Sequence, residues 1–144
     1  LNDEVKILEV QQLRHPIDDL KPVVELDELL QLQEAIKSVY VAPALKKYMV
    51  ELTRATRESS DVYLGASPRG SLGLFRSSQA RAAMHGRDYV LPDDVKYLAE
   101  YVLSHRMVVQ PAARLRNLAA DQIVKENLSI LPVPGGDLSG RTQA

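Results

Sequence analysis

The stretch Leu64-Gly65-Ala66-Ser67-Pro68-Arg69 carries the clearest local structural signal in the sequence. Its glycine lets the backbone turn, its serine hydroxyl can accept a hydrogen bond from a free helical N–H group, and its proline presets φ for a first helical turn. These features predict a helix from about residue 68 to residue 85. Gly86 then supplies a left-handed stop.

Arg69 falls in the first turn of that predicted helix, where the positive end of the helix dipole disfavours a cation. A nearby anion would therefore stabilise the Arg69 guanidinium at this position. A phosphate from outside the chain would meet this need, and so would a carboxylate such as that of Glu58 or Asp61. The spacing alone leaves both partners open.

Proline marks further helix starts on both sides of this stretch. Ala42-Pro43 opens one helix, Pro92 opens another, and Pro111 precedes a helix that we expect over residues 113–130, before Leu131-Pro132. The helix after Pro43 has apolar side chains on one face, namely Leu45, Tyr48, Met49, Leu52 and Ala55. Strand character is confined to Val62–Leu64 and Tyr89–Leu91.

Two more helices are predicted in the N-terminal part. The first covers about residues 3–13 and is capped by Asn2, and the second covers about residues 28–39 and is capped by Asp27. The second should bury a stripe made of Leu29, Leu30, Leu32, Ile36 and Val39. The fold class is therefore all-α, a bundle of about five to six helices with at most one very short β-ribbon. We expect a helical domain over residues 1–131 and a flexible tail over 132–144.

Composition excludes several classes of function. The 144 residues contain 18 Lys and Arg against 19 Asp and Glu, a net charge of −1, which argues against a general nucleic-acid binder. Zero cysteines exclude a disulfide framework and a thiolate nucleophile and fit a reducing compartment, so we expect a cytoplasmic protein. No apolar run is long enough for a membrane span, and the start at Leu1 suggests a piece of a longer chain.

Charge is distributed unevenly along the chain. Residues 1–36 hold nine acidic and three basic residues, a net charge of −6, so the remainder carries +5. Most of that excess comes from Lys46, Lys47, Arg54, Arg57, Arg69, Arg76, Arg81 and Arg87. A solvated helix surface explains such a run more simply than an anion-binding face.

Common catalytic motifs are absent from the sequence. There is no phosphate-binding G-x-x-x-x-G-K-[ST] loop, no G-x-S-x-G and no H-E-x-x-H. The three histidines, His15, His85 and His105, lack metal-ligand spacing, and we expect His85 and His105 near helix C-termini. The sequence therefore predicts no catalytic residue and no metal site.

Taken together, six short motifs resemble the lid, the C-terminal helical subdomain, of the MoxR-type AAA+ ATPases. Their order and spacing match, and weaker similarity extends over most of the chain. The motifs are Thr56-Arg57, Leu64-Gly65-Ala66-Ser67-Pro68-Arg69, Ala80-Arg81-Ala82, Gly86-Arg87-Asp88-Tyr89-Val90, Pro92-Asp93-Asp94-Val95 and Val102-Leu103-Ser104-His105-Arg106. The chain departs from the family pattern at Gly70, where alanine is usual.

This resemblance implies a subdomain that closes over ATP and Mg²⁺ bound by a separate N-terminal AAA+ core of the same chain. The arginine of the Ser-Pro-Arg motif is the family's second sensor, which carries over to Arg69 as the nucleotide-binding residue. Arg57, Arg87 and Arg106 also fall in matching motifs, and we interpret them as structural. The fragment alone should bind no cofactor and hydrolyse no ATP.

The family further implies a hexameric ring of neighbouring subunits and a chaperone-like role in assembling or activating an unidentified client protein. The main alternative is a stand-alone helical adaptor that binds a partner through the acidic first helices and exposed leucines. A weaker alternative is a DNA-binding helical domain that uses the basic residues between Lys46 and Arg87. A phosphate-loop motif preceding Leu1 would favour the lid.

Overall fold

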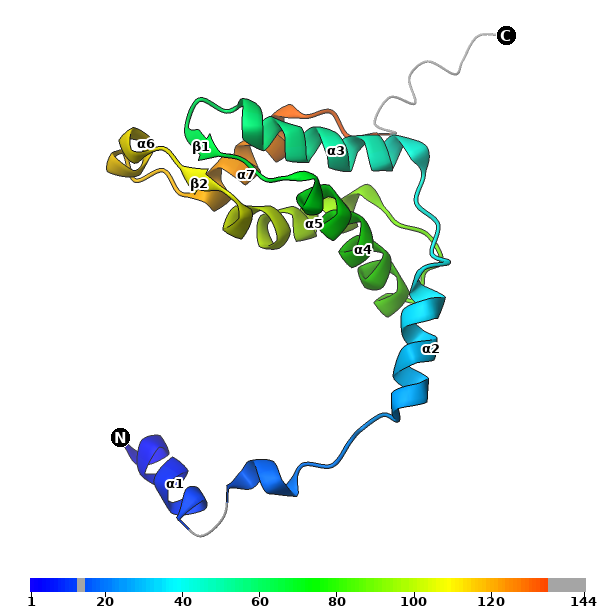
Figure 1. Cartoon of the computed structure of the whole chain (residues 1–144), viewed down its shortest axis with the longest axis vertical. Coiled ribbons are helices and arrows are strands. Elements are labelled where there is room, and N and C mark those ends of the chain that lie inside the picture. The colour runs from blue at the N-terminus through cyan, green and yellow to red at the C-terminus, as the bar shows by residue number, and fades with distance from the viewer. Residues whose placement is uncertain (13–14, 135–144) are drawn as a thin grey trace. The chain divides into compact units, whose positions relative to one another are not determined.

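The computed structural model describes residues 1–12 and 15–134 (Figure 1). The chain divides into two compact units, Leu1–Gln33 and a larger unit that begins at Glu34. In chain order the elements are α1 (Asn2–Gln11), η1 (Pro16–Asp19), α2 (Leu26–Ile36), α3 (Pro43–Glu58), β1 (Val62–Leu64), α4 (Pro68–Met84), α5 (Pro92–Leu103), η2 (Ser104–Arg106), β2 (Val108–Val109), α6 (Pro111–Leu115) and α7 (Ala120–Ile130). The predicted all-α fold is confirmed, with one two-stranded sheet in the described residues.

The core of the larger unit lies between α3, α4, α5 and α7. Helix α4 packs against α3 and α5, and α7 packs against the same two helices (Figure 1). The predicted stripe of α3 is buried at Leu45, Tyr48, Met49 and Leu52. Apolar side chains of α4, α5 and α7 complete this core, among them Leu74, Val95 and Ile123.

The signals around α4 are confirmed in detail. The Ser67 hydroxyl accepts a hydrogen bond from the N–H of Arg69, and Pro68 is the first residue of the helix. His85 is the C-cap, and Gly86 follows with a φ of +68°. His105 lies in η2, directly after α5.

The β-ribbon forms with a partner that the sequence did not indicate. β1 pairs with β2 in antiparallel fashion, and Val62 lies opposite Val109 (Figure 1). Tyr89, in the second segment of predicted strand character, forms only an isolated bridge to Tyr40.

The last predicted helix, over residues 113–130, is wrong as a single element. The chain forms α6 and α7 instead, because Asn117 adopts a left-handed φ of +60° between them. The N–H of Leu118 donates back to the carbonyl of Ala113, which closes α6. Asparagine tolerates this conformation better than other non-glycine residues. The end at Leu131 is confirmed, since Leu131 is the C-cap of α7.

The N-terminal unit differs from expectation at both helix starts. Leu1, rather than Asn2, is the N-cap of α1, because the N–H of Val5 already donates to the carbonyl of Leu1. Helix α2 begins at Leu26, and so Asp27 lies inside it. The predicted cap by the Asp27 side chain is therefore absent from this helix start, where the Glu25 N–H donates to a Glu28 carboxylate oxygen.

The predicted buried stripe of the second helix is also wrong for its leucines. Leu29, Leu30 and Leu32 are 41%, 52% and 56% exposed. The helix ends at Ile36, and Val39 is buried in the loop that follows. Residue 13, the predicted last position of the first helix, and residues 135–144 of the predicted tail lie outside the described residues.

Candidate functional site

Arg69 is exposed in the first turn of α4. The two carboxylates that the sequence offered as its partners bond elsewhere, since Glu58 pairs with Arg54 and Asp61 pairs with Arg116. Within residues 1–12 and 15–134, no carboxylate lies within ion-pair distance of Arg69. The carboxylate alternative is therefore not what the structure shows, and the guanidinium is available to an external anion.

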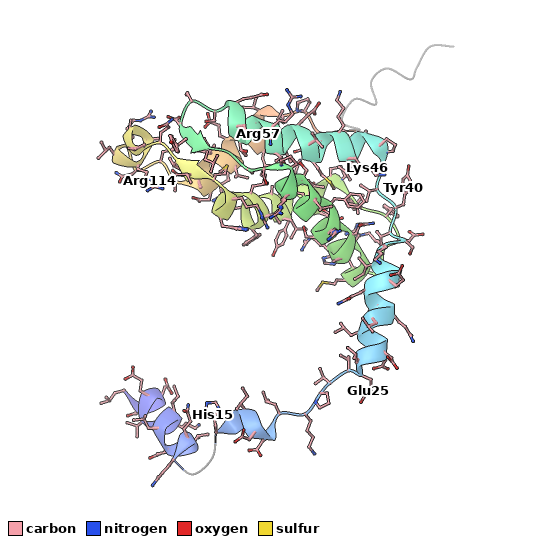
Figure 2. All side chains as sticks on the ribbon, viewed as in Figure 1. His15, Glu25, Tyr40, Lys46, Arg57 and Arg114 are labelled. Carbon is pink, nitrogen blue, oxygen red and sulfur yellow. The ribbon has the colours of Figure 1, made fainter. Side chains whose placement is uncertain are left out.

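The segment that leads into α4 is held by the last turn of α3, where Arg57 lies (Figure 2). Thr56 Oγ1 accepts from the Ala66 N–H at 3.0 Å and donates to the Thr53 carbonyl at 2.7 Å. Arg57 Nη1 donates to the Ala66 carbonyl at 2.7 Å. Both backbone polar groups of Ala66 are thus bonded to consecutive residues of one helix.

Glycine is required at position 65 by the close approach of that helix. A Cβ on Gly65 would lie 2.6 Å from Arg57 Cγ and 2.7 Å from Arg57 Cα, which no real side chain tolerates. At Gly70, the departure from the family pattern, a Cβ would lie 3.0 Å from Leu103 Cδ2. Alanine at position 70 would need a small shift of that flexible side chain.

Arg87 belongs to a network centred on the buried carboxylate of Asp94. Its two terminal nitrogens each donate to one oxygen of Asp94 at 2.8 Å. Arg81 Nε lies 3.3 Å from the same carboxylate, and its guanidinium stacks 3.7 Å from the centre of the Tyr97 ring. This network joins the end of α4 to the start of α5.

Burial by itself raises the pKa of the Asp94 carboxyl. Hydrogen bonds from Arg87 and from the Leu91 N–H, with the charges of Arg87 and Arg81, outweigh that effect and hold this pKa below its usual range. Asp94 therefore stays ionised and paired, as expected of a structural group.

The interpretation of Arg57, Arg87 and Arg106 as structural residues agrees with their contacts. Arg57 bonds a loop carbonyl, Arg87 bonds Asp94, and Arg106 Nε donates to the Val102 carbonyl at 2.9 Å. Half of the eight residues in the wider basic run are paired as well, because Lys47, Arg54, Arg81 and Arg87 each have an acidic partner. This pairing weakens the DNA-binding alternative.

In the residues that the structure describes, Arg69 is an exposed cation without an acidic partner. Across the part of the chain that the structure describes, no cluster of three or more His, Asp or Glu could hold a metal ion. A cavity of about 410 Å³ lies elsewhere, beside β2, α6 and the start of α7. No helix in the same described part is both long and apolar enough to cross a membrane. The exposed guanidinium of Arg69 can bind an anion.

Two buried side chains that organise this region, those of Thr56 and Asp94, could not be singled out as site residues from the sequence. Thr56 lies four residues after Leu52, so it extends the apolar face of α3, and this spacing was visible in the sequence. Asp94 falls in the Pro92-Asp93-Asp94-Val95 motif, in a first helical turn where a carboxylate is favourable without any further partner. The short separation of Arg87 from Asp88, Asp93 and Asp94 indicated acidic partners nearby, but the sequence did not single out Asp94 as the buried one.

Comparisons with known proteins agree with the fold and the motifs. A family model described as the AAA lid domain matches residues 54–127. The uncharacterized protein YeaC of Bacillus subtilis is 41% identical over 133 residues, which cover 92% of this chain and 42% of that protein. Chaperone MoxR1 of Mycobacterium tuberculosis is 33% identical over 123 residues, which cover 79% of this chain and 33% of that protein.

A solved structure has a similar fold. It is a crystal structure of a candidate ATPase from Cytophaga hutchinsonii, with a TM-score of 0.76 and 27% identity, covering 92% of this chain and 43% of that one. The chain therefore spans less than half the length of each of these relatives.

Proposed function

The chain belongs to the AAA lid domain family, and from this premise we propose that it closes over ATP bound by the AAA+ core of the same protein, with Arg69 contacting the γ-phosphate. The observation that carries the proposal is the exposed Arg69 guanidinium, which has no acidic partner in the described residues. A cation left unpaired at the positive end of a helix is more stable beside an anion.

Arginine suits this role for two reasons. Its guanidinium is always charged, and its planar fork can donate two parallel hydrogen bonds to phosphate oxygens. Because the contact would join the lid to the nucleotide, it would depend on whether the γ-phosphate is present. Hydrolysis would therefore loosen the closed lid.

In this proposal, the AAA+ core of the same protein supplies most of the nucleotide site. ATP supplies the phosphoryl group and Mg²⁺ neutralises its charge, but the described residues hold no ligand cluster for a metal ion. Arg69 is the residue of this chain that would touch the nucleotide. We propose a ring of such subunits, hexameric as in the resemblance, with a chaperone-like action on an unidentified client protein.

The test is turnover of ATP by the intact ATPase after substitution of Arg69. Arg69→Ala should lower turnover by more than about tenfold, since arginines that stabilise phosphoryl-transfer charge contribute on the order of a thousandfold. Arg69→Lys keeps the charge but loses the planar fork, so a bidentate contact predicts substantial loss there too.

Arg54→Ala is the matched control, because it removes an exposed arginine that pairs with Glu58 in α3. It should leave turnover near the wild-type value. Normal ATP hydrolysis by Arg69→Ala in the assembled ring would sink the proposal, and Arg69 would then be a helix-start residue on a shared fold.

A stand-alone adaptor remains the second candidate, favoured by the exposed apolar side chains of α1. Val5, Ile7, Leu8 and Val10 are all at least 46% exposed. An adaptor should capture a client protein using this chain alone, whereas the lid should not. A pull-down with the 144-residue chain separates the two, and we expect it to recover no specific client.

A further inference from the structure

We propose that Thr56 and Arg57 are positioning residues for Arg69, so that the last turn of α3 sets where the sensor guanidinium lies. This inference rests on the proposed function of Arg69. It assigns a specific task to two side chains that both hydrogen-bond to the backbone of Ala66.

The first step is the anchoring of Ala66. Its N–H donates to Thr56 Oγ1 at 3.0 Å, and its carbonyl accepts from Arg57 Nη1 at 2.7 Å. The Ala66 and Thr56 residues are both fully buried, so water cannot replace the threonine hydroxyl at low cost. One peptide segment is therefore fixed at both of its polar groups.

The second step is the close contact at Gly65. The Gly65 Cα approaches so near to Arg57 that an added Cβ would lie 2.7 Å from the Arg57 N and Cα atoms. The loop thus lies directly against the α3 backbone. A shift of the loop away from α3 would break both hydrogen bonds and this contact together.

The third step is the short, stiff connection between Ala66 and Arg69. Only Ser67 and Pro68 separate Ala66 from Arg69. Pro68 has a fixed φ, and the Ser67 hydroxyl accepts from the Arg69 N–H at 3.3 Å. Little torsional freedom remains between the anchored residue and the sensor, and so the start of α4 follows the end of α3.

Arg57 is well suited to an anchoring role because its terminal nitrogen reaches a carbonyl nine residues ahead in the chain. Its acceptor is a neutral backbone carbonyl, and no carboxylate in the described residues forms an ion pair with it. By contrast, Arg54 lies one turn earlier on the same helix and only pairs with Glu58 at 3.3 Å. Arg54→Gln is therefore a matched control that makes the same chemical change without touching the loop.

The experiment is a double-mutant cycle in the intact ATPase. Arg57→Gln should lower ATP turnover by at least about fivefold, since a misplacement of about 1 Å can cost on the order of a hundredfold. In the Arg69→Ala background the same change should lower turnover by less than about twofold, because the residue to be positioned is gone. Arg54→Gln should have no effect in either background.

A second pair of variants guards against simple loss of folding. Thr56→Ser keeps the hydroxyl and should retain turnover, whereas Thr56→Val keeps the shape, loses both hydrogen bonds and should behave like Arg57→Gln. Hydrogen–deuterium exchange of the peptide covering residues 65–70 gives an independent readout. Thr56→Val should speed exchange of the Ala66 amide on the order of tenfold, with α5 amides unchanged.

The outcomes are separable. If Arg69→Ala retains activity, the sensor role fails, and the exchange data alone decide whether the anchor exists. If Arg69→Ala is impaired but Arg57→Gln is not, the positioning role is wrong. Losses that multiply in the double variant would show that Arg57 acts independently of Arg69 and would overturn the inference.

Discussion

Helices α2 and α3 both carry leucines at helical spacing, but only α3 buries them. Leu45 and Leu52 of α3 are 3% and 0% exposed, whereas Leu29 and Leu32 of α2 are 41% and 56% exposed. The two helices have similar patterns and different surroundings, because α4 and α7 pack directly on α3. A periodic apolar stripe indicates that a helix has a face to bury and does not indicate what covers it.

The same contrast separates residues 1–33 from the unit that begins at Glu34, in the last turn of α2. All described residues of α1 are exposed, while the unit beginning at Glu34 contains the complete hydrophobic core. Substitutions of its buried residues should therefore change the free energy of unfolding of the chain, and substitutions of the exposed leucines of α2 should not.

The largest expected effect is that of Leu52→Ala in α3. Leu52 is fully buried, so the substitution should lower the free energy of unfolding by about 2–5 kcal/mol through lost burial and a cavity. Val50→Ala is the control on the same helix, since Val50 is 46% exposed. Urea denaturation followed by circular dichroism measures both, and equal small losses would show that the α3 stripe is not a core.

Asp94→Asn should have the next largest effect. It leaves the forks of Arg87 and Arg81 without their carboxylate, which should lower the free energy of unfolding at pH 7 by about 1.5–3 kcal/mol. The neighbouring Asp93→Asn is the control, because the Asp93 side chain is 89% exposed. A similar loss in both variants would contradict a specific role for the buried pair.

The pH dependence of that effect follows from the lowered pKa of Asp94. A carboxyl whose pKa is lower in the folded state contributes its full stability above the unfolded value of about 3.9. That contribution is lost as the pH falls through the lower folded pKa. The stability difference between wild type and Asp94→Asn should therefore be constant near neutrality and shrink below about pH 4.

A smaller effect is expected for Gly86→Ala, which tests the end of α4. Gly86 has a φ of +68°, and a Cβ there would meet no atom within 4 Å. The cost is therefore confined to the backbone and should be about 1–2 kcal/mol. Asn117→Gly, at the other described residue with positive φ, should cause no loss. Thermal melting of both variants separates them.

The helix starts of the larger unit could be predicted because the causes are local. Pro43, Pro68 and Pro92 each begin a helix, and the Ser67 cap and the Gly86 stop lie where the sequence places them. The break between α6 and α7 was missed because Asn117 can continue a helix as well as end it, and only the surrounding packing decides.

The candidate site was predictable only in part, for a related reason. Arg69 could be singled out because its place in a first helical turn is locally unfavourable. Its anchors could not, since the hydrogen bond from the Ala66 N–H to Thr56 Oγ1 spans ten residues and joins the loop before α4 to the last turn of α3. The pairing of Asp61 with Arg116 spans 55 residues and is likewise invisible to any local pattern.

The smallest expected effect is that of Leu30→Ala in α2, and it is the sharpest test of the contrast with α3. Leu30 is 52% exposed, so its truncation in the 144-residue chain should change the free energy of unfolding by less than about 0.5 kcal/mol. Exposed leucines of this helix would still promote self-association, so the variant should also show weaker concentration dependence in sedimentation velocity than wild type. Lys37→Ala, which removes only the exposed ion pair with Glu34, is the control and should leave self-association unchanged. A loss of more than about 1 kcal/mol for Leu30→Ala would mean that α2 is covered in solution as α3 is, and the distinction drawn between the two stripes would fail.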